Sequence, residues 1–250
     1  MERDLSLESP QLKAAIDKFT PFVAEARRRI LFTLAVFVVA SVGGFVFYEK
    51  IIKFLLGALS LYGTNIVFTS PFQFINLAFS CGLVTGIVVV MPILIIQILF
   101  FLKPALRRKE YVMATRFLPF SAFLFAVGFV FGALIMKWQI DIFLARASSL
   151  GIGNVLDISQ LLSVVLLTSV LMGVGFQFPI VLLILMRLGI VKHEQIAKKR
   201  LWVYLGTFVF TLFLPPDSIL ADVILTLPFI LSFESTLIIN RILERKKKEK

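Results

Sequence analysis

Long apolar runs dominate the chain, and none of them shows the alternation of apolar and polar positions that is typical of strands. A run of about 20 apolar residues can cross a hydrocarbon core of about 30 Å as a helix. Helices satisfy every backbone hydrogen-bonding group within the bilayer, so the runs predict transmembrane helices. The six predicted spans are 30–48, 72–102, 112–136, 160–186, 201–214 and 218–239. The fold class is therefore an all-α membrane protein.

The predicted spans differ in length. The span 72–102 would extend about 46 Å at ~1.5 Å per residue, whereas 201–214 would extend only about 21 Å. Short fifth and sixth spans predict local thinning of the membrane on one side of the molecule. Long helices beside short ones suggest a concave, glove-like bundle. The connection 50–63 is apolar but short, and predicts either an interfacial helix or a helix packed over the mouth of the bundle.

Composition and charge predict how the spans are oriented in the membrane. The chain has 250 residues, of which 59% are apolar, above the roughly 45–50% of soluble domains. Of its 26 Lys and Arg residues, 22 lie in four segments: 1–29, 103–116, 187–200 and 241–250. The other connections hold only Lys50, Lys53, Lys137 and Arg146. The positive-inside rule then predicts that both termini are cytoplasmic. The net charge of +11 is thus interpreted as contact with an anionic cytoplasmic leaflet, and nucleic-acid binding is not expected.

Three segments follow from this topology. We expect a cytoplasmic N-terminal segment with an interfacial helix at 1–29, one six-span domain at 30–239, and a basic cytoplasmic tail at 240–250. The first twenty residues are polar and charged, so no cleaved signal is expected. Prolines predict turns or kinks at six positions: Pro71, Pro92, Pro104, Pro179, Pro215 and Pro216.

Enzyme chemistry finds little support in the sequence. Cys81 is the only cysteine and lies in an apolar run, which excludes disulfides and thiolate metal sites. His193 is the only histidine and has no acidic cluster around it. Zinc-protease and phosphate-loop motifs are absent from the sequence, as is a nucleophile–base pair for an intramembrane hydrolase. We expect neither a cofactor nor a metal.

Polar groups within the apolar zone are functional candidates, because burying them in lipid is costly. Gln177 either bonds a backbone carbonyl freed by Pro179 or forms a docking point for a partner helix. Asp217 is placed to cap the sixth span, whereas Asp222 should lie below the interface. Glu234 either pairs with a basic loop residue or titrates.

Two carboxylates stand among basic residues, Glu25 before three arginines and Glu110 after two arginines and a lysine. Local pairing of Glu25 with Arg28 or Arg29, and of Glu110 with Arg107, explains both. Exposed pairs of this kind contribute only about 0.2–0.5 kcal/mol.

Six motifs, in order and at matching spacing, resemble the TatC family, the multi-spanning core of the twin-arginine protein translocase. They are EARRRIL (25–31), TSPFQFINL (69–77), PILIIQILFFLKPALRRKE (92–110), FQFPIVLLILMRLGIV (176–191), AKKR (197–200) and PPDS (215–218). The similarity spans nearly the whole chain from about Phe22. One departure is Gln177, where the family usually has a buried glutamate.

The resemblance implies a non-enzymatic receptor for twin-arginine signal peptides of folded cargo proteins. Its signal-peptide site, carried over by position, would be Glu25 and Glu110, with Arg27 and Phe101 nearby. Two carboxylates close in space can each accept a guanidinium fork, whose geometry lysine does not reproduce.

The resemblance further implies an oligomeric complex in a prokaryotic plasma membrane, driven by the proton-motive force. Its partners would be single-span TatA-type and TatB-type subunits. We expect their contacts at four residues: Gln177, Asp217, Asp222 and Glu234.

The alternative from the residues is a small-solute secondary transporter. Asp222, Glu234 and Gln177 would form its buried coupling site. A transporter predicts solute flux from the single chain in liposomes, and a translocase core predicts none without its partners.

Overall fold

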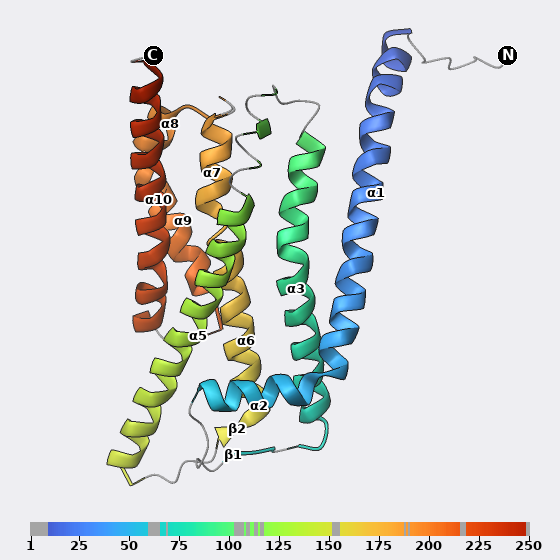
Figure 1. Ribbon diagram of the computed structural model, residues 1–250. Helices are drawn as coiled ribbons and strands as arrows, with labels where there is room; N and C mark the ends of the chain where they lie inside the picture. Colours follow the sequence, from blue (N-terminus) through green and yellow to red (C-terminus); the bar gives the residue numbers. More distant parts are fainter. Residues whose placement is uncertain are drawn as a thin grey trace, which may run out of the picture.

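The computed structural model describes residues 10–59, 66–68, 70–102, 108, 111–112, 115, 118–151, 156–187, 189, 191–215 and 219–248. Within these ranges the chain is almost entirely helical (Figure 1). The helices are α1 (Pro10–Val46), α2 (Tyr48–Ala58), α3 (Gln73–Leu102), α5 (Leu118–Ser149), α6 (Ile158–Gly175), α7 (Phe178–Arg187), α8 (His193–Lys198), α9 (Arg200–Leu212) and α10 (Ile219–Lys248). Two short strands, β1 (Ile66–Val67) and β2 (Leu156–Asp157), pair in parallel.

Five helical segments are long and apolar enough to cross a membrane. They are Val23–Val46, Gln73–Ile98, Pro119–Ser149, Ile158–Met186 and Ile219–Ile242. The all-α membrane fold predicted from the sequence is confirmed. The remaining predicted span, 201–214, corresponds to α9, a shorter apolar helix of 13 residues. The count of six spans therefore stays a prediction.

Two elements differ from the sequence prediction. The third predicted span ended at 136, but α5 continues to Ser149. Lys137 and Asp141 end the apolar run without ending the helix, because Ile140 and Ala147 continue its buried face. The fourth predicted span is divided into α6 and α7 just before Pro179, whose ring and missing N–H disrupt a continuous helix.

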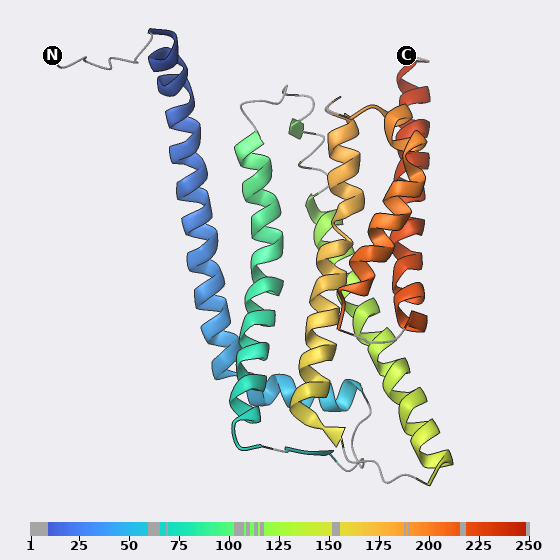
Figure 2. The ribbon, with the colours of Figure 1, turned by 180° about the vertical axis from the view of Figure 1, so that it is seen from behind.

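The helix α2 lies across one end of the bundle, nearly perpendicular to its neighbours (Figures 1 and 2). Its Leu55 and the following Leu59 are buried in a cluster with Leu77 of α3, Met136 of α5 and Leu162 of α6. Of the two interpretations of this apolar connection, packing over the mouth of the bundle is the one that the structure supports.

Polar contacts fix the starts of α3 and α6 to each other beneath α2. Asp157 caps α6 by accepting hydrogen bonds from the backbone N–H groups of Ser159 and Gln160 at 2.9 and 3.1 Å. The same carboxylate accepts from Gln73 Nε2 at 2.5 Å, and Ser159 Oγ donates to the Gln73 carbonyl at 2.9 Å. This network holds the α2 end of the bundle together.

The helix α1 stands at the edge of the bundle and packs mainly against α3. The two helices touch near the α2 end and diverge toward the other end (Figures 1 and 2). α1 also runs without a break through Arg29, so the predicted boundary at 29/30 is a change of composition within one helix. The N-terminal end of α1 and the C-terminal end of α10 lie at the same end of the bundle (Figure 1). This arrangement agrees with the prediction that both termini lie on one side of the membrane.

Candidate functional site

Glu25 lies on α1 at the end of the bundle opposite α2, and its carboxylate is engaged through one oxygen. Arg29, one turn along the helix, donates to Glu25 Oε1 from Nε at 3.0 Å and from Nη2 at 2.5 Å. The Glu25 side chain is still 41% exposed. Local pairing with Arg29, one of the two pairings expected from the sequence, is therefore present.

Arg29 also connects α1 to α3. Its Nη1 donates to Gln97 Oε1 at 2.9 Å, and its guanidinium lies 5.8 Å from the centre of the Phe100 ring. With one face on an aromatic ring and its donors shared between two helices, the guanidinium is held in place. The Arg29 side chain is only 25% exposed.

A pocket of about 580 Å³ opens beside this pair. It is lined by Ala24, Glu25, Arg28, Arg29, Phe32 and Gln97. We call it the polar pocket. Phe101 lines an adjacent apolar pocket, and Arg27 is exposed on α1 without lining either one. Glu110 lies outside the described residues, so a close approach of Glu25 and Glu110 stays a prediction.

Sequence reasoning did not assign a role to Gln97, although the residue lies within one of the quoted motifs. The signal that could have identified it was a lone amide in an otherwise apolar stretch, MPILIIQILF. Its partner is 68 positions away in the chain, so no local spacing connects it to Arg29.

Gln177 lies at the break between α6 and α7 and is only 7% exposed. Its Oε1 accepts from Ser121 Oγ of α5, and its Nε2 donates to the carbonyls of Ser121 and Gly173 at 3.2 and 3.4 Å. The Gly173 carbonyl lacks the backbone hydrogen bond of a continuous helix, because the Gln177 N–H donates to the Val174 carbonyl instead. The amide thus bonds backbone carbonyls within the chain. Neither is the carbonyl that Pro179 itself frees, which would be that of Gly175, four residues before the proline.

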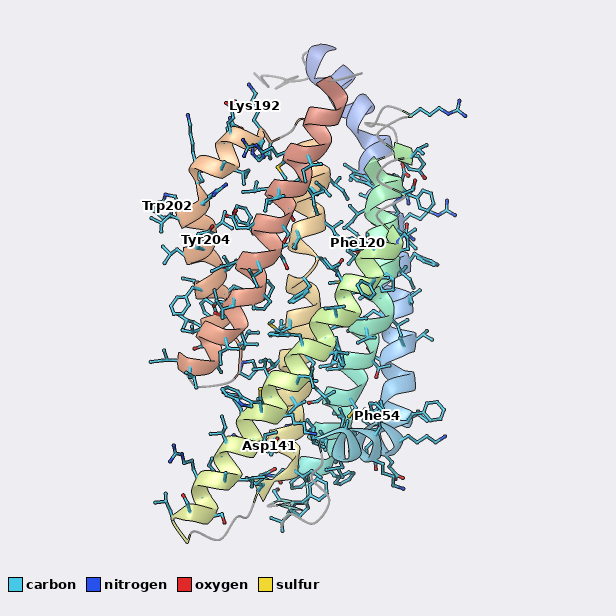
Figure 3. The ribbon with its side chains drawn as sticks, turned by 60° about the vertical axis from the view of Figure 1, so that its left-hand side comes forward. Phe54, Phe120, Asp141, Lys192, Trp202 and Tyr204 are labelled. Carbon is cyan, nitrogen blue, oxygen red and sulfur yellow. The ribbon has the colours of Figure 1, made fainter. Side chains whose placement is uncertain are left out.

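Glu234 of α10 faces α9. Its carboxylate accepts a hydrogen bond from the Tyr204 hydroxyl and lies 3.6 Å from Arg200 Nη1. This is the pairing with a basic residue that was one of its two interpretations. Figure 3 shows Tyr204 and Trp202 on α9, and Trp202 is 72% exposed.

The residues of the transporter alternative do not form one site. Asp222 and Glu234 are twelve residues apart on α10, which is about 18 Å along a helix. Asp222 is 5% exposed in the first turn of α10, and Gln177 bonds α5 rather than α10. Asp217 lies outside the described residues.

The predicted proline positions are distributed along the fold. Pro92 lies within α3, Pro179 near the start of α7, and Pro71 and Pro215 in turns next to helices. Pro104 and Pro216 lie outside the described residues.

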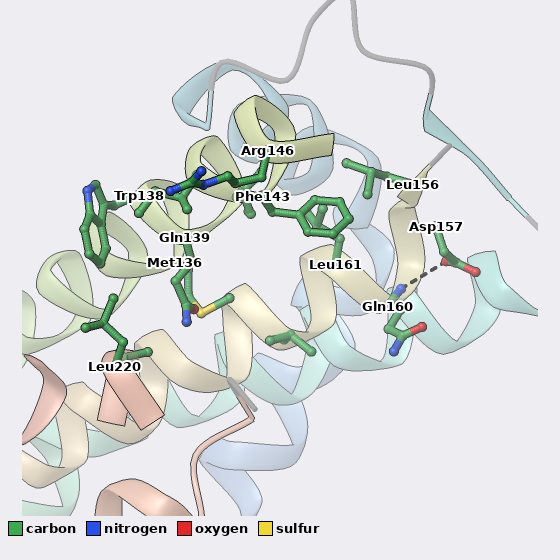
Figure 4. Close-up of a pocket in the computed structure, with 14 residues that line it drawn as sticks. Met136, Trp138, Gln139, Phe143, Arg146, Leu156, Asp157, Gln160, Leu161 and Leu220 are labelled. Carbon is green, nitrogen blue, oxygen red and sulfur yellow. Dashed lines mark hydrogen bonds between the residues drawn. The ribbon is translucent and has the colours of Figure 1, made fainter. Parts of the chain in front are cut away.

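Another pocket, of about 590 Å³, lies at the other end of the bundle between α5, α6 and the start of α10 (Figure 4). Trp138 and Arg146 of α5 and Asp157 at the start of α6 are among its lining residues. Glu25, Arg27 and Phe101, the described residues among those carried over from the family, do not line it.

Comparison with known proteins identifies the family. The family described as Sec-independent protein translocase protein (TatC) matches residues 21–228. The chain belongs to the TatC family. TatC is a non-enzymatic membrane component of the twin-arginine, or Sec-independent, protein translocase.

Individual relatives cover nearly the whole chain. TatCy of Bacillus subtilis is 30% identical over 231 residues, which is 90% of this chain and 89% of the relative. TatC of Aquifex aeolicus is 26% identical over 239 residues, 92% of this chain and 97% of the relative. A crystal structure of the twin arginine translocase receptor TatC in the detergent DDM superposes with a TM-score of 0.78 at 24% identity. It covers 88% of this chain and 99% of that one, and it supports the fold.

Proposed function

We propose that this TatC protein is the receptor for twin-arginine signal peptides of folded precursor proteins. The peptide binds around Glu25, on a surface that faces the cytoplasm of a prokaryotic cell. The observation that carries the proposal is the one-sided engagement of Glu25, whose Oε1 receives both hydrogen bonds from Arg29. Within the described residues, Oε2 accepts no hydrogen bond, and Glu25 is one of the residues that line the polar pocket.

The arrangement suits an arginine better than a lysine. A guanidinium is planar and presents several donors, so it can bind Glu25 from the side of Oε2 while Arg29 holds the other oxygen. An ammonium is a strongly hydrated point charge and cannot reproduce this fork. Glu110, as the second carboxylate carried over from the family, would receive the other arginine of the pair.

Partner recruitment is the second part of the proposal. Single-span TatA-type and TatB-type subunits dock on the outer face of α9, where Leu201, Trp202 and Leu205 are each more than half exposed. Gly206 lies in a groove of about 440 Å³ on this helix, and no atom lies within 4 Å of where its Cβ would be. Small residues allow the close helix approach that drives association in lipid.

Two of the predicted contact residues, Gln177 and Glu234, form hydrogen bonds that hold together the helices around this surface. Gln177 ties the start of α7 to α5, and Glu234 ties α10 to α9. Gly175 of α6, Phe178 of α7 and Phe229 of α10 line the groove. Assembly there gives an oligomeric complex that uses the proton-motive force for export, with both termini in the cytoplasm.

Site-specific photocrosslinking of a signal peptide in membranes tests the receptor proposal. We expect a twin-arginine peptide to label the polar pocket, and Glu25→Ala, Glu110→Ala or a twin-lysine peptide to reduce labelling at least about tenfold, the loss of roughly 1.4 kcal/mol. Glu49→Gln, which changes an exposed carboxylate on α2 at the other end of the bundle, is the matched control. Equal labelling in all combinations would mean that Glu25 only balances local charge.

Substitution of Gly206 tests the docking surface. We expect Gly206→Leu to reduce copurification of the single-span partners at least about tenfold, because the new side chain fills the groove where a helix must approach. Gly43→Leu is the control, since a Cβ at Gly43 of α1 would likewise have no atom within 4 Å. Full partner recovery with Gly206→Leu would rule out this face.

A further inference from the structure

The pocket of about 590 Å³ at the α2 end of the bundle has no part in the proposed receptor function. Its walls are the second half of α5, the first turns of α6 and the start of α10. Most of the lining is apolar, and Arg146 of α5 is its one basic residue (Figure 4). We call this space the α5–α6 pocket.

Arg146 carries one of the few positive charges on its side of the predicted topology. Only four of the 26 Lys and Arg residues lie outside the segments predicted to be cytoplasmic, and Arg146 is one of them. Two of the others contact the protein itself. Lys137 Nζ donates to the Ala58 carbonyl at 3.4 Å, and Lys50 Nζ lies 5.1 Å from the centre of the Phe47 ring. Within the described residues, the Arg146 guanidinium forms no ion pair, so its charge is available to a ligand.

The one carboxylate in the lining, Asp157, is engaged elsewhere. It accepts hydrogen bonds from the backbone N–H groups of Ser159 and Gln160 and from Gln73 Nε2. These bonds hold it at the start of α6, whereas Arg146 belongs to the α5 wall. A ligand in the pocket therefore meets a guanidinium without a carboxylate partner, next to apolar side chains.

The Arg146 side chain points back along α5. Figure 4 shows it extending toward Gln139 and Trp138, which precede it by about two turns. Side chains on a helix tilt toward its N-terminus, so this direction follows from the helix itself. Gln139 adds amide N–H donors, and tryptophan is enriched at the level of lipid headgroups. The groups that suit a headgroup therefore gather on the α5 wall.

The pocket extends over about the depth of one leaflet. Met136 and Arg146 are ten residues apart on α5, about 15 Å along the helix. A hydrocarbon core of about 30 Å gives each leaflet about half of that thickness. Beside the pocket, α5 and α6 continue toward α2 beyond the level at which α10 begins (Figures 1 and 2). In a membrane, lipid fills the space that the short α9 and the late start of α10 leave there.

We propose that the α5–α6 pocket binds one phospholipid from the leaflet on the α2 side of the membrane. The phosphodiester accepts hydrogen bonds from the Arg146 guanidinium, whose planar fork matches two phosphate oxygens. An acyl chain lies on the apolar lining and covers Phe143 and Leu220, which are 55% and 60% exposed in the protein alone. The inference is independent of the proposed receptor site, which lies at the other end of the bundle.

The lining favours a phospholipid over simpler ligands of the same chemistry. Free phosphate would pair with Arg146 but leave the apolar walls uncovered. A glycolipid would cover those walls but bring no anion to the guanidinium. Only a molecule with both parts satisfies the charge and the apolar lining together.

Lipid binding to the full chain in detergent tests the proposal. Native mass spectrometry measures the binding of dioleoyl phosphatidylglycerol, and glucosyl dioleoylglycerol, with the same chains but no phosphate, is the matched lipid. We expect phosphatidylglycerol to bind at least about tenfold more tightly, and Arg146→Gln to remove this preference. Lys50→Gln removes an exposed charge on the same side and should leave the preference unchanged. Equal binding of the two lipids to the wild type, or an unchanged preference in Arg146→Gln, would overturn the proposal.

Photoaffinity lipids test where the molecule lies. One phosphatidylglycerol carries a diazirine in its headgroup, and another carries it at the end of an acyl chain. We expect the headgroup probe to label Trp138 and the chain-end probe to label Met136 and Leu220. Val130, which is 54% exposed on α5 and does not line the pocket, reports general surface lipid. Arg146→Gln should reduce pocket labelling at least about tenfold and leave Val130 labelling within about twofold. Equal loss at both places, or no loss in the pocket, would contradict a bound phospholipid.

Discussion

Replacing Gly44 by leucine should lower the free energy of unfolding by about 3 kcal/mol, the upper end of what overpacking a core costs. Gly44 is buried on α1, and a Cβ there would lie 2.5 Å from both Cβ and Oγ1 of Thr85 and 3.0 Å from the Cys81 carbonyl oxygen. The Thr85 hydroxyl donates to that same carbonyl at 2.7 Å, so rotating it away breaks a hydrogen bond. The helix α1 has to move away from α3 instead.

Gly43→Leu is the matched control, because it makes the same substitution one residue away where no atom lies within 4 Å. Its helix propensity improves by roughly 0.8 kcal/mol or less, so unfolding in detergent should show unchanged or slightly higher stability. Opposite signs for the two variants would establish that contact with α3, and not loss of glycine, sets the cost. Equal stability of both variants would contradict the close approach of α1 and α3.

The consequence extends to the proposed signal-peptide site. Gly44 lies fifteen residues from Arg29, about 22 Å along α1. A rigid helix that pivots at the glycine contact would separate Arg29 from Gln97 at the other end, and so join the polar pocket to the adjacent apolar pocket that Phe101 lines. The close contact at one end of α1 therefore positions the carboxylate at the other end.

Much of the fold follows from hydropathy alone, because each helix in lipid must be apolar over most of its length. The extension of α5 to Ser149 could not be predicted in this way, since Lys137 and Asp141 carry charge where the apolar run ends. Its continued helix depends on Ile140 and Ala147 packing into the core, which is a tertiary effect. The pairing of β1 with β2 joins segments 90 positions apart, and two-residue strands have no pattern to detect.

The site was predictable only in its local part. The spacing of Glu25 and Arg29 predicts their ion pair, and the structure contains it. The contact of Arg29 with Gln97 depends on how α1 crosses α3, which no spacing specifies. Gln177 was predicted as a candidate because of its polarity in an apolar span, but its bonds to Ser121 required the fold of α5 against α6.

Polar side chains likewise hold the short apolar helix α9 in place. α9 has 13 residues, a length at which isolated helices are marginal. The Thr211 and Thr226 hydroxyls lie 2.7 Å apart at one end of its contact with α10, and Tyr204 donates to Glu234 nearer the other. The hydrophobic effect does not hold two helices together in lipid, so these hydrogen bonds supply part of the attraction between α9 and α10.

Replacing Glu234 by leucine should therefore lower the free energy of unfolding by about 1.5–3 kcal/mol, the net contribution of a hydrogen bond to a charged group. Most of this loss should come from Tyr204, because Arg200 is 48% exposed and its ion pair of 3.6 Å is a surface one of small value. Arg200→Gln should accordingly cost less than about 1 kcal/mol.

A double-mutant cycle separates the hydroxyl–carboxylate contact from other effects. Tyr204→Phe keeps the edge-to-face contact with the Phe233 ring, 6.0 Å between centres, and removes only the hydroxyl. We expect the double variant Tyr204→Phe/Glu234→Leu to be more stable than the sum of the single losses predicts, by about 1 kcal/mol or more. If the losses are additive, Tyr204 and Glu234 act independently, and the contact does not hold α9 against α10. If they couple as expected, the same cycle read out as partner copurification should show the same non-additivity, because this contact would position the proposed docking face of α9.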